Sequence, residues 1–356
     1  MALWYFAVLH HGVNMHLVYV AAITTGVAVF LKKPVDALMV NARRDYEYDE
    51  YGLSKRKGNY EKLSREERDK IDLQKTADME RILDSTALKK MTKEGEKNPD
   101  AAMNSLVGMG VVKRRLGEMV ARMEFEKGNK QKTIESRHMI FYGSPGTGKT
   151  TVARIVTGFL YKYHYIKKNK CVEVDGNFLK AGTDTATKTE LVIRQAIGGV
   201  LFIDEAYALL DSSDASGEQA IATLIKQMED RRTEFILILA GYRDEMKELL
   251  ESNPGFKSRI KEFWEFPDYD SFETREIFVS MANKKGFAVD NKALDRLDIR
   301  IEKERKFNSF ANGRTLRNIL DESIDHHAYN FVNGKLSEDD RYRICAEDIS
   351  VKLNSL

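Results

Sequence analysis

The chain has 356 residues, 31% of them charged, and its 57 basic and 55 acidic side chains nearly cancel to a net charge of +2 at pH 7. This balance leaves no basic footprint for nucleic acid, so we expect no nucleic-acid partner. The length suffices for one domain of about 150–170 residues with a smaller domain beside it. Cys171 and Cys345 lie far apart in the sequence, which suits a reducing compartment, and no Cys/His cluster has metal-ligand spacing.

The N-terminal segment is apolar. Residues 1–31 contain no Asp, Glu, Lys or Arg, and their apolar run ends directly before Lys32 and Lys33. At about 19 residues the run is close to the length that spans a bilayer, and basic flanks normally lie on the cytoplasmic side. We therefore expect residues 1–32 to anchor the chain in a membrane, with the remainder in the cytoplasm. The alternatives are an apolar helix buried against protein and a targeting segment, while a cleaved signal peptide is disfavoured because nothing basic precedes the run.

Residues 33–104 are dense in charges of both signs. Within them, Ser64-Arg65-Glu66-Glu67 fits a capping box and predicts a helix that continues to about residue 90. Alternating charges of this kind are typical of a solvated helix face. We expect a largely helical linker or partner-binding region between the N-terminal segment and a folded domain.

A phosphate-binding loop is predicted at Gly143–Thr150, which fits the pattern G-x-x-x-x-G-K-[ST]. A buried-strand pattern at 138–142 precedes it and a helix pattern at 151–160 follows it. Glycines allow successive N–H groups to face an anion, and the helix N-terminus adds a partial positive charge. Lys149 would reach the β- and γ-phosphates, and Thr150 would ligate Mg²⁺. The residues assigned to the nucleotide in this segment are Gly143, Ser144, Pro145, Gly146, Thr147, Gly148, Lys149, Thr150 and Thr151.

Two carboxylates follow a second apolar segment. Val200–Ile203 is typical of a strand covered on both faces, and Asp204 and Glu205 stand at its C-terminal end, where open α/β sheets place ligands. We expect Asp204 to contact the nucleotide through Mg²⁺. Glu205 would polarise the attacking water as a general base. Without the phosphate-binding loop upstream, such a pair would indicate only a solvated turn.

Further motifs follow in a set order. A strand pattern covers 235–241, and in the C-terminal part Arg314 and Arg317 are three apart, so they share a helix face. With these pieces the chain resembles AAA+ ATPases of the CbbX/SpoVK-like branch over about residues 105–350. The segments that carry the resemblance are Leu106–Met109, Val112–Arg115, the phosphate-binding loop, Leu201–Leu209, Leu239–Met246, Ser252–Ile260, Phe266–Tyr269 and Asn312–Asn318.

The resemblance implies an α/β core with a parallel sheet at 105–270, a helical lid domain at 271–356, and ATP as the nucleotide. It implies that Arg259 is an arginine finger supplied to a neighbouring subunit. Arg314 would be the second sensor of the γ-phosphate, with Arg317 as the fallback. The first sensor stays unassigned, because Ala240-Gly241-Tyr242 stands at its usual position.

One segment departs from the branch. Where its members carry an aromatic residue that grips substrate in a central pore, this chain has Lys180 or Ala181, and Phe178 lies nearby but out of register. Phe178 could therefore belong to the core or to a pore.

The function that follows is a membrane-tethered ATPase that assembles into a ring, expected to be a hexamer, because one chain cannot supply Arg259 to its own site. ATP hydrolysis would remodel a protein client. The alternative is a nucleotide-gated scaffold or secretion accessory that binds a partner without threading it. A loader acting on DNA is disfavoured by the balanced charge.

Overall fold

The computed structural model describes residues 46–48, 54–56, 85–126, 137–181, 185–210 and 216–352. The chain divides into two units at Asp78. In the first unit, β1 (Tyr46–Tyr48) pairs antiparallel with β2 (Ser54–Arg56).

Two expectations lie outside the described residues, namely the membrane anchor at 1–32 and the capping box that begins at Ser64. Within the described ranges, the structure contains no helix of the length and apolarity that a bilayer crossing needs.

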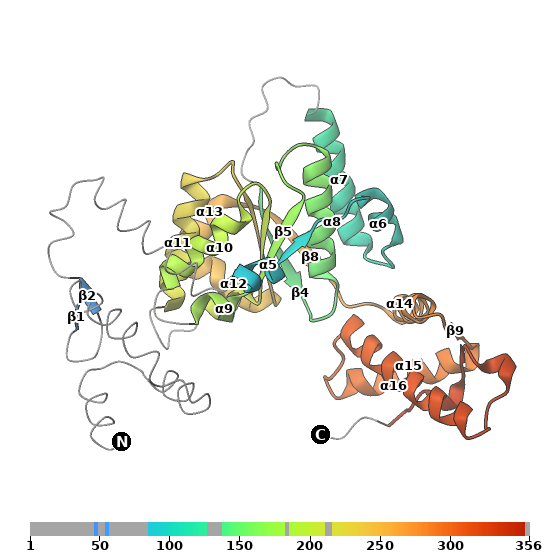
Figure 1. The fold of residues 1–356 in the computed structure, drawn as a ribbon. Coiled ribbons are helices and arrows are strands. Elements are labelled where there is room, and N and C mark those ends of the chain that lie inside the picture. Colours follow the sequence, from blue (N-terminus) through green and yellow to red (C-terminus); the bar gives the residue numbers. More distant parts are fainter. Residues whose placement is uncertain are drawn as a thin grey trace, which may run out of the picture. The chain divides into compact units, whose positions relative to one another are not determined.

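A six-stranded sheet organises the second unit, with the order β3-β5-β6-β7-β4-β8 (Figure 1). Every neighbouring pair is parallel except β3 and β5, which are antiparallel. The predicted strands at 138–142, 200–203 and 235–241 are all strands of this sheet. In spatial order the strands are β3 (Thr92–Glu94), β5 (Lys170–Asp175), β6 (Val200–Asp204), β7 (Ile236–Gly241), β4 (His138–Gly143) and β8 (Ile260–Phe266).

The sheet also takes in residues upstream of 105, in the segment that its charge pattern assigned to a linker. The edge strand β3 is followed by Gly95, whose N–H donates to the carbonyl of Asn169 at 3.3 Å. Helix α6 (Pro99–Ser105) then packs on α8 (Lys149–Lys162). The contact is close, because a Cβ atom at Gly158 of α8 would lie 3.1 Å from Cβ of Pro99 and 2.3 Å from the carbonyl oxygen of Glu96, which precedes α6. An edge strand of three residues has no apolar periodicity of its own, so the sequence pattern did not reveal it.

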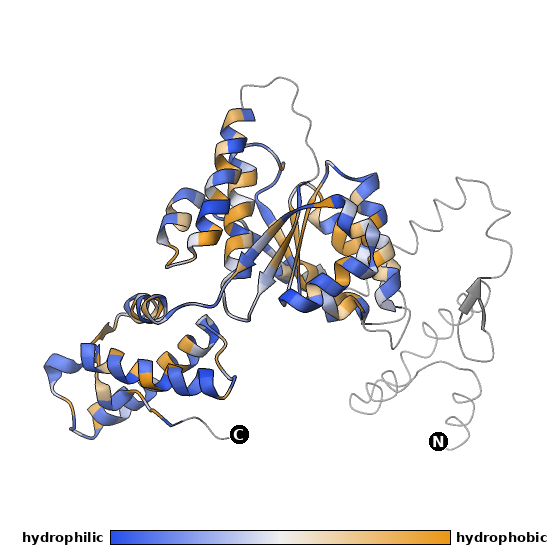
Figure 2. Cartoon of the chain, turned by 180° about the vertical axis from the view of Figure 1, so that it is seen from behind, coloured by the Kyte–Doolittle hydropathy of each residue, from blue (hydrophilic) through white to orange (hydrophobic). Residues whose placement is uncertain are grey.

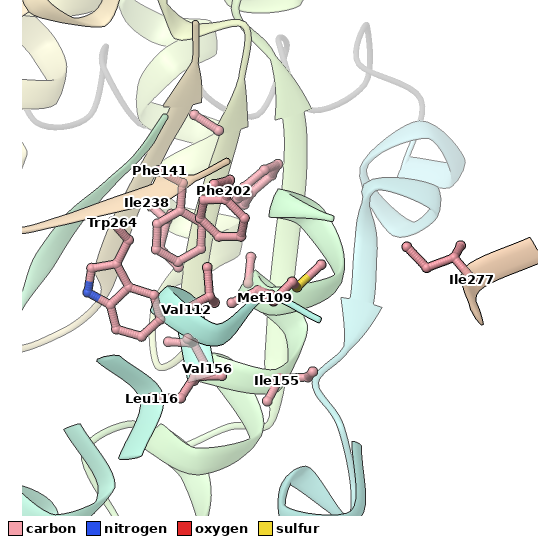
Figure 3. Packing of buried hydrophobic residues seen from close by; sticks show 14 of the residues in the cluster. Met109, Val112, Leu116, Phe141, Ile155, Val156, Phe202, Ile238, Trp264 and Ile277 are labelled. Carbon is pink, nitrogen blue, oxygen red and sulfur yellow. The ribbon is translucent and has the colours of Figure 1, made fainter. Parts of the chain in front are cut away.

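Helices cover both faces of the sheet, and two apolar clusters fill the layers between them. One layer contains Phe141, Phe202, Ile238 and Trp264 (Figure 3). The rings of Phe141 and Trp264 are stacked, with their centres 5.3 Å apart. The alternate residues of the same strands point into the other layer, as the period of two in a strand requires. The covering helices and turns are α5 (Ser85–Met91), α7 (Gly110–Glu126), α8, α9 (Gly176–Lys180), α10 (Thr185–Ala196), η2 (Ala206–Leu210), α11 (Ser216–Asp230), α12 (Arg243–Ser252) and α13 (Pro254–Arg259).

A helical lid follows the sheet. Asp270 caps its first helix with a complete capping box to Glu273. Figure 2 shows hydrophobic stripes along the lid helices, which pack on one another around Phe278, Leu297 and Leu316. The lid elements are α14 (Ser271–Lys284), β9 (Ala288–Val289), α15 (Asn291–Lys306), α16 (Gly313–Val332), η3 (Glu338–Asp340), β10 (Arg343–Ile344) and η4 (Ala346–Asp348).

Candidate nucleotide-binding site

The phosphate-binding loop connects β4 to α8, as the sequence predicts. Gly146 and Gly148 have φ values of +72° and +90°, which glycine adopts at no steric cost. At Gly146 a side chain is also excluded by steric crowding, because a Cβ atom there would lie 2.1 Å from the carbonyl oxygen of Ala311. Beneath the loop, the buried hydroxyl of Thr147 donates to the carbonyl of Ser144 at 2.8 Å. The loop is therefore held in shape by its own contacts and by the lid.

Lys149 is the first residue of α8 and is 9% exposed. Its ammonium group donates to the carbonyl oxygens of Gly143 and Ser144 at 2.7 and 2.9 Å. Burial lowers the pKa of Lys149, the nearby carboxylate of Asp204 partly offsets this, and the charge of Arg314 adds to it. A phosphate beside Lys149 would supply the negative charge that this buried ammonium group lacks.

Asp204 is the last residue of β6, which lies between β5 and β7 in the sheet, and Glu205 directly follows it. Glu205 has a φ of +48°, a region that costs a non-glycine residue on the order of 1–3 kcal/mol. The chain leaves the strand direction at this residue, and its carbonyl accepts from the N–H of Ala208 at 2.9 Å as η2 begins. Both carboxylates consequently border one cavity with Lys149.

This cavity has a volume of about 670 Å³ and is bordered by the core and by the lid. Most of the predicted residues line it, namely Pro145, Gly146, Gly148, Lys149, Thr150, Thr151, Asp204, Glu205, Arg314 and Arg317. Gly143, Ser144 and Thr147 do not line the cavity: the carbonyls of Gly143 and Ser144 accept from Lys149, and the hydroxyl of Thr147 donates to the carbonyl of Ser144. The structure therefore brings the phosphate-binding loop, both carboxylates and both lid arginines together.

Several lining residues were not assigned to the site from the sequence. Leu106, Val107 and Met109 of the core face Ile277 and Met281 of α14 around the same cavity. Apolar side chains of this kind suit the faces of a nucleobase. The first three lie in a segment that contributes to the family resemblance, whereas the two lid residues have no sequence signal beyond the apolar pattern of a helix. Tyr207, Gly241, Tyr242 and Lys284 also line the cavity.

Arg259 lies elsewhere, at the end of α13. Its guanidinium pairs with Glu229 of α11 at 3.1 Å and donates to the carbonyl of Gly255 at 3.0 Å. Arg259 immediately precedes β8, whose first residue, Ile260, is in register with His138 at the start of β4. The strand that continues into the phosphate-binding loop thus starts next to the arginine.

Phe178 packs against the apolar cluster on one face of the sheet. The ammonium group of Lys188 lies 4.9 Å from the centre of its ring and donates to its carbonyl oxygen at 2.8 Å. Of the two positions that the sequence left open for Phe178, these contacts favour the core.

Comparison with known proteins agrees with this geometry. Residues 139–305 match the model of the ATPase family associated with various cellular activities (AAA), and residues 271–356 match the AAA lid domain. The chain belongs to the AAA family of ATPases, whose members hydrolyse ATP.

Within that family the chain is 34% identical to stage V sporulation protein K of Bacillus subtilis, over 72% of this chain and 83% of the relative. It is 40% identical to CbbX of Cereibacter sphaeroides, over 61% of this chain and 72% of the relative. It is 37% identical to the chloroplastic ribulose bisphosphate carboxylase/oxygenase activase of Cyanidioschyzon merolae, over 68% of this chain and 87% of the relative. The AAA domain of FIGL-1 in complex with ADP superimposes with a TM-score of 0.51 at 17% identity, covering 72% of this chain and 84% of that one, which shows the shared fold.

Proposed function

We propose that this ATPase assembles into a ring, expected to be a hexamer, and uses ATP hydrolysis to remodel a protein partner. The observation that carries the proposal is the position of Arg259. The residue is held by Glu229 and Gly255, away from the cavity that contains Lys149, Asp204 and Glu205. An arginine that completes a site from outside must come from another subunit, and such a residue raises phosphoryl-transfer rates by on the order of 10³–10⁵.

The site is suited to magnesium-dependent hydrolysis. The hydroxyl of Thr150 and the carboxylate of Asp204 line one cavity, and oxygen ligands of this kind are those that Mg²⁺ prefers. The ion would neutralise charge on the β- and γ-phosphates when bound. Lys149 would hold the same phosphates, and Glu205 would accept the proton of the attacking water.

The lid is joined to the loop that would bind the phosphates. The N–H of Gly313 donates to the carbonyl of Gly146 at 3.0 Å, so the N-terminal end of α16, whose first two turns carry Arg314 and Arg317, lies against that loop. A change in charge at the γ-phosphate would act on both arginines and therefore on the lid. A ring of such subunits would pass this movement to a bound client.

The decisive test uses the Glu205→Gln variant, which should bind ATP without turning it over. We expect its mass in solution to rise to about six chains with ATP and Mg²⁺ and to fall when nucleotide is removed. The Arg259→Ala variant is the comparison, since it should bind nucleotide in its own site and hydrolyse it poorly. A mass that stays monomeric with nucleotide demonstrably bound would contradict the ring.

We further propose that residues 1–32 tether the ATPase to a membrane from the cytoplasmic side. The proposal is supported by residues 1–31, which contain no charged side chain, and by Lys32 and Lys33 directly after them. Flotation of the full chain with lipid vesicles, compared with a chain starting at residue 33, would test the tether.

The client is proposed to be a protein. The name of one relative describes a protein that activates a carboxylase, which supports a protein rather than a nucleic acid as the client.

One observation favours a second candidate, a nucleotide-gated scaffold that binds a partner without threading it. Phe178, the aromatic residue nearest to the pore position, packs against the core and beneath Lys188. Substituting Lys180 and Phe178 separates the two functions. If neither change affects client processing while Glu205→Gln abolishes it, the scaffold is the better description.

A further inference from the structure

Arg259 is held by contacts to two helices of its own subunit. One terminal nitrogen of its guanidinium lies 3.1 Å from the carboxylate of Glu229, the last residue but one of α11. The other terminal nitrogen donates to the carbonyl of Gly255 at 3.0 Å and to the hydroxyl of Ser258 at 3.2 Å, both in α13. The guanidinium is therefore fixed at one end by its own helix and at the other by a neighbouring helix.

The third guanidinium nitrogen does not contribute to this arrangement. Nε of Arg259 is buried and has no hydrogen-bond partner among the described residues. The orientation of the guanidinium consequently depends on its two terminal nitrogens alone. Contacts at two points fix the plane of a guanidinium, whereas a contact at one point leaves it free to turn. Glu229 supplies the second point.

Glu229 is carried by a helix that is packed along its length. Helix α11 contacts η2 closely, since a Cβ atom at Gly217 would lie 2.2 Å from the carbonyl oxygen of Leu209. It also contacts α13 closely, since a Cβ atom at Gly255 would lie 2.9 Å from the side chain of Ile225. The carboxylate is therefore attached to a well-packed support beside the arginine that it orients.

The ion pair between Glu229 and Arg259 is not suited to a mainly stabilising role. The side chain of Glu229 is 58% exposed, and an exposed ion pair contributes little to the free energy of unfolding. The other arginine at this end of α11, Arg231, is engaged by Gln227 at 2.6 Å and by Glu234 at 3.1 Å. What the pair provides is a defined orientation of the Arg259 guanidinium.

We propose that Glu229 is the positioning residue of Arg259, holding the guanidinium in the plane in which it meets the γ-phosphate bound by the neighbouring subunit. The inference rests on the proposed role of Arg259 as an arginine finger. Each terminal nitrogen carries two hydrogens, so the nitrogen that contacts Glu229 keeps one N–H for a phosphate oxygen. A side chain that is ordered in advance loses less conformational entropy when the transition state forms.

The first test compares two substitutions of the same residue. Glu229→Ala removes the contact, whereas Glu229→Gln keeps an oxygen that can accept from the guanidinium. We expect kcat to fall about tenfold in Glu229→Ala with KM nearly unchanged, and Glu229→Gln to retain most of the activity. Glu251→Ala is the matched control, because Glu251 is exposed and pairs with Lys247 within α12. An increase of kcat in Glu229→Ala would overturn the inference, since Glu229 would then restrain the arginine.

A second measurement shows in which subunit's site Glu229 acts. In a mixture of Lys149→Ala and Arg259→Ala subunits, hydrolysis requires Arg259 of the first variant in the site of the second. Adding Glu229→Ala to the Lys149→Ala chain should lower the activity of this mixture about tenfold, and adding it to the Arg259→Ala chain should leave the activity as it was. Equal losses from both placements would indicate a role in folding alone and overturn the inference. A reference mixture without activity would instead contradict the arginine finger, and with it the proposed function.

Discussion

The side-chain amide of Asn312 donates a hydrogen bond to the carbonyl oxygen of Pro145 at 3.2 Å, joining the residue before the lid helix α16 to the phosphate-binding loop. The same amide nitrogen donates to Asp268 at 2.9 Å, and its oxygen accepts from the N–H of Tyr269 at 3.0 Å. Asn312 is fully buried. One side chain therefore links the loop, the connection between core and lid, and the lid itself.

Replacing Asn312 should weaken this junction. Asn312→Gly removes all three hydrogen bonds but tolerates the φ of +48° at this position. We expect the free energy of unfolding to fall by about 1–3 kcal/mol, because buried partners lose their hydrogen bonds, and kcat to fall with it. Chemical denaturation and steady-state ATPase assays would measure both. Asn333→Gly, which removes one exposed contact to Tyr329 at the far end of α16, should change neither appreciably.

Close approach at the loop should make Gly146 intolerant of any side chain. Gly146→Ala places a Cβ atom 2.1 Å from the carbonyl of Ala311, in addition to the backbone cost of a φ of +72°. Gly286→Ala isolates the second effect, since Gly286 has a φ of +85° and open space around it. We expect Gly286→Ala to lose about 1–2 kcal/mol of stability and to keep nucleotide binding. Gly146→Ala should lose nucleotide binding as well, as calorimetric titration with ADP would show.

If each active site is completed by Arg259 of a neighbouring subunit, two inactive variants should complement each other in a mixed ring. Lys149→Ala should abolish nucleotide binding in its own site and still present Arg259 to a neighbour. Arg259→Ala should bind nucleotide and lack the finger. Each variant alone should hydrolyse ATP at least about 100-fold more slowly than the parent. Mixing the two should restore part of the activity, and a mixture no more active than its components would rule out an arginine supplied between subunits.

Acid should destabilise the chain through His138. The side chain is fully buried in β4, its Nδ1 accepts from the N–H of Leu237 at 3.0 Å, and burial lowers the pKa of His138 to about 4. The unfolded chain binds a proton here near pH 6.5, whereas the folded chain does not until about pH 4. The stability from this residue is thus complete above about pH 6.5 and decreases as the pH falls toward 4, by about 1.4 kcal/mol per unit.

The measurement is the free energy of unfolding between pH 4 and 7.5 for the parent chain and for His138→Gln, which keeps an acceptor for Leu237. Other groups titrate in both chains, so the difference between the two curves reports His138. The curves should diverge below pH 6.5 with the variant less sensitive to acid, and parallel curves would refute the assignment.

Much of the site could be predicted from local sequence. The loop at Gly143–Thr150 combines glycine, lysine and threonine at spacings imposed by phosphate geometry, and the strand before Asp204 is apolar enough to be recognised alone. Both lie where predicted, because neighbouring residues along the chain determine a turn and a buried strand. The edge strand β3 was missed because three charged or polar residues acquire strand structure only by pairing with β5.

Contacts between segments that are distant in the sequence could not be predicted from it. No local pattern shows that Asn312 donates a hydrogen bond to Pro145, that Arg259 forms an ion pair with Glu229, or that the ring of Tyr207 stacks on that of Tyr242. Side chains far apart in the chain meet only when the sheet places β6 beside β7 and the lid packs on the loop. The residues that would bind phosphate can thus be recognised from the sequence alone, whereas the residues that would sense phosphate are brought together only by tertiary packing.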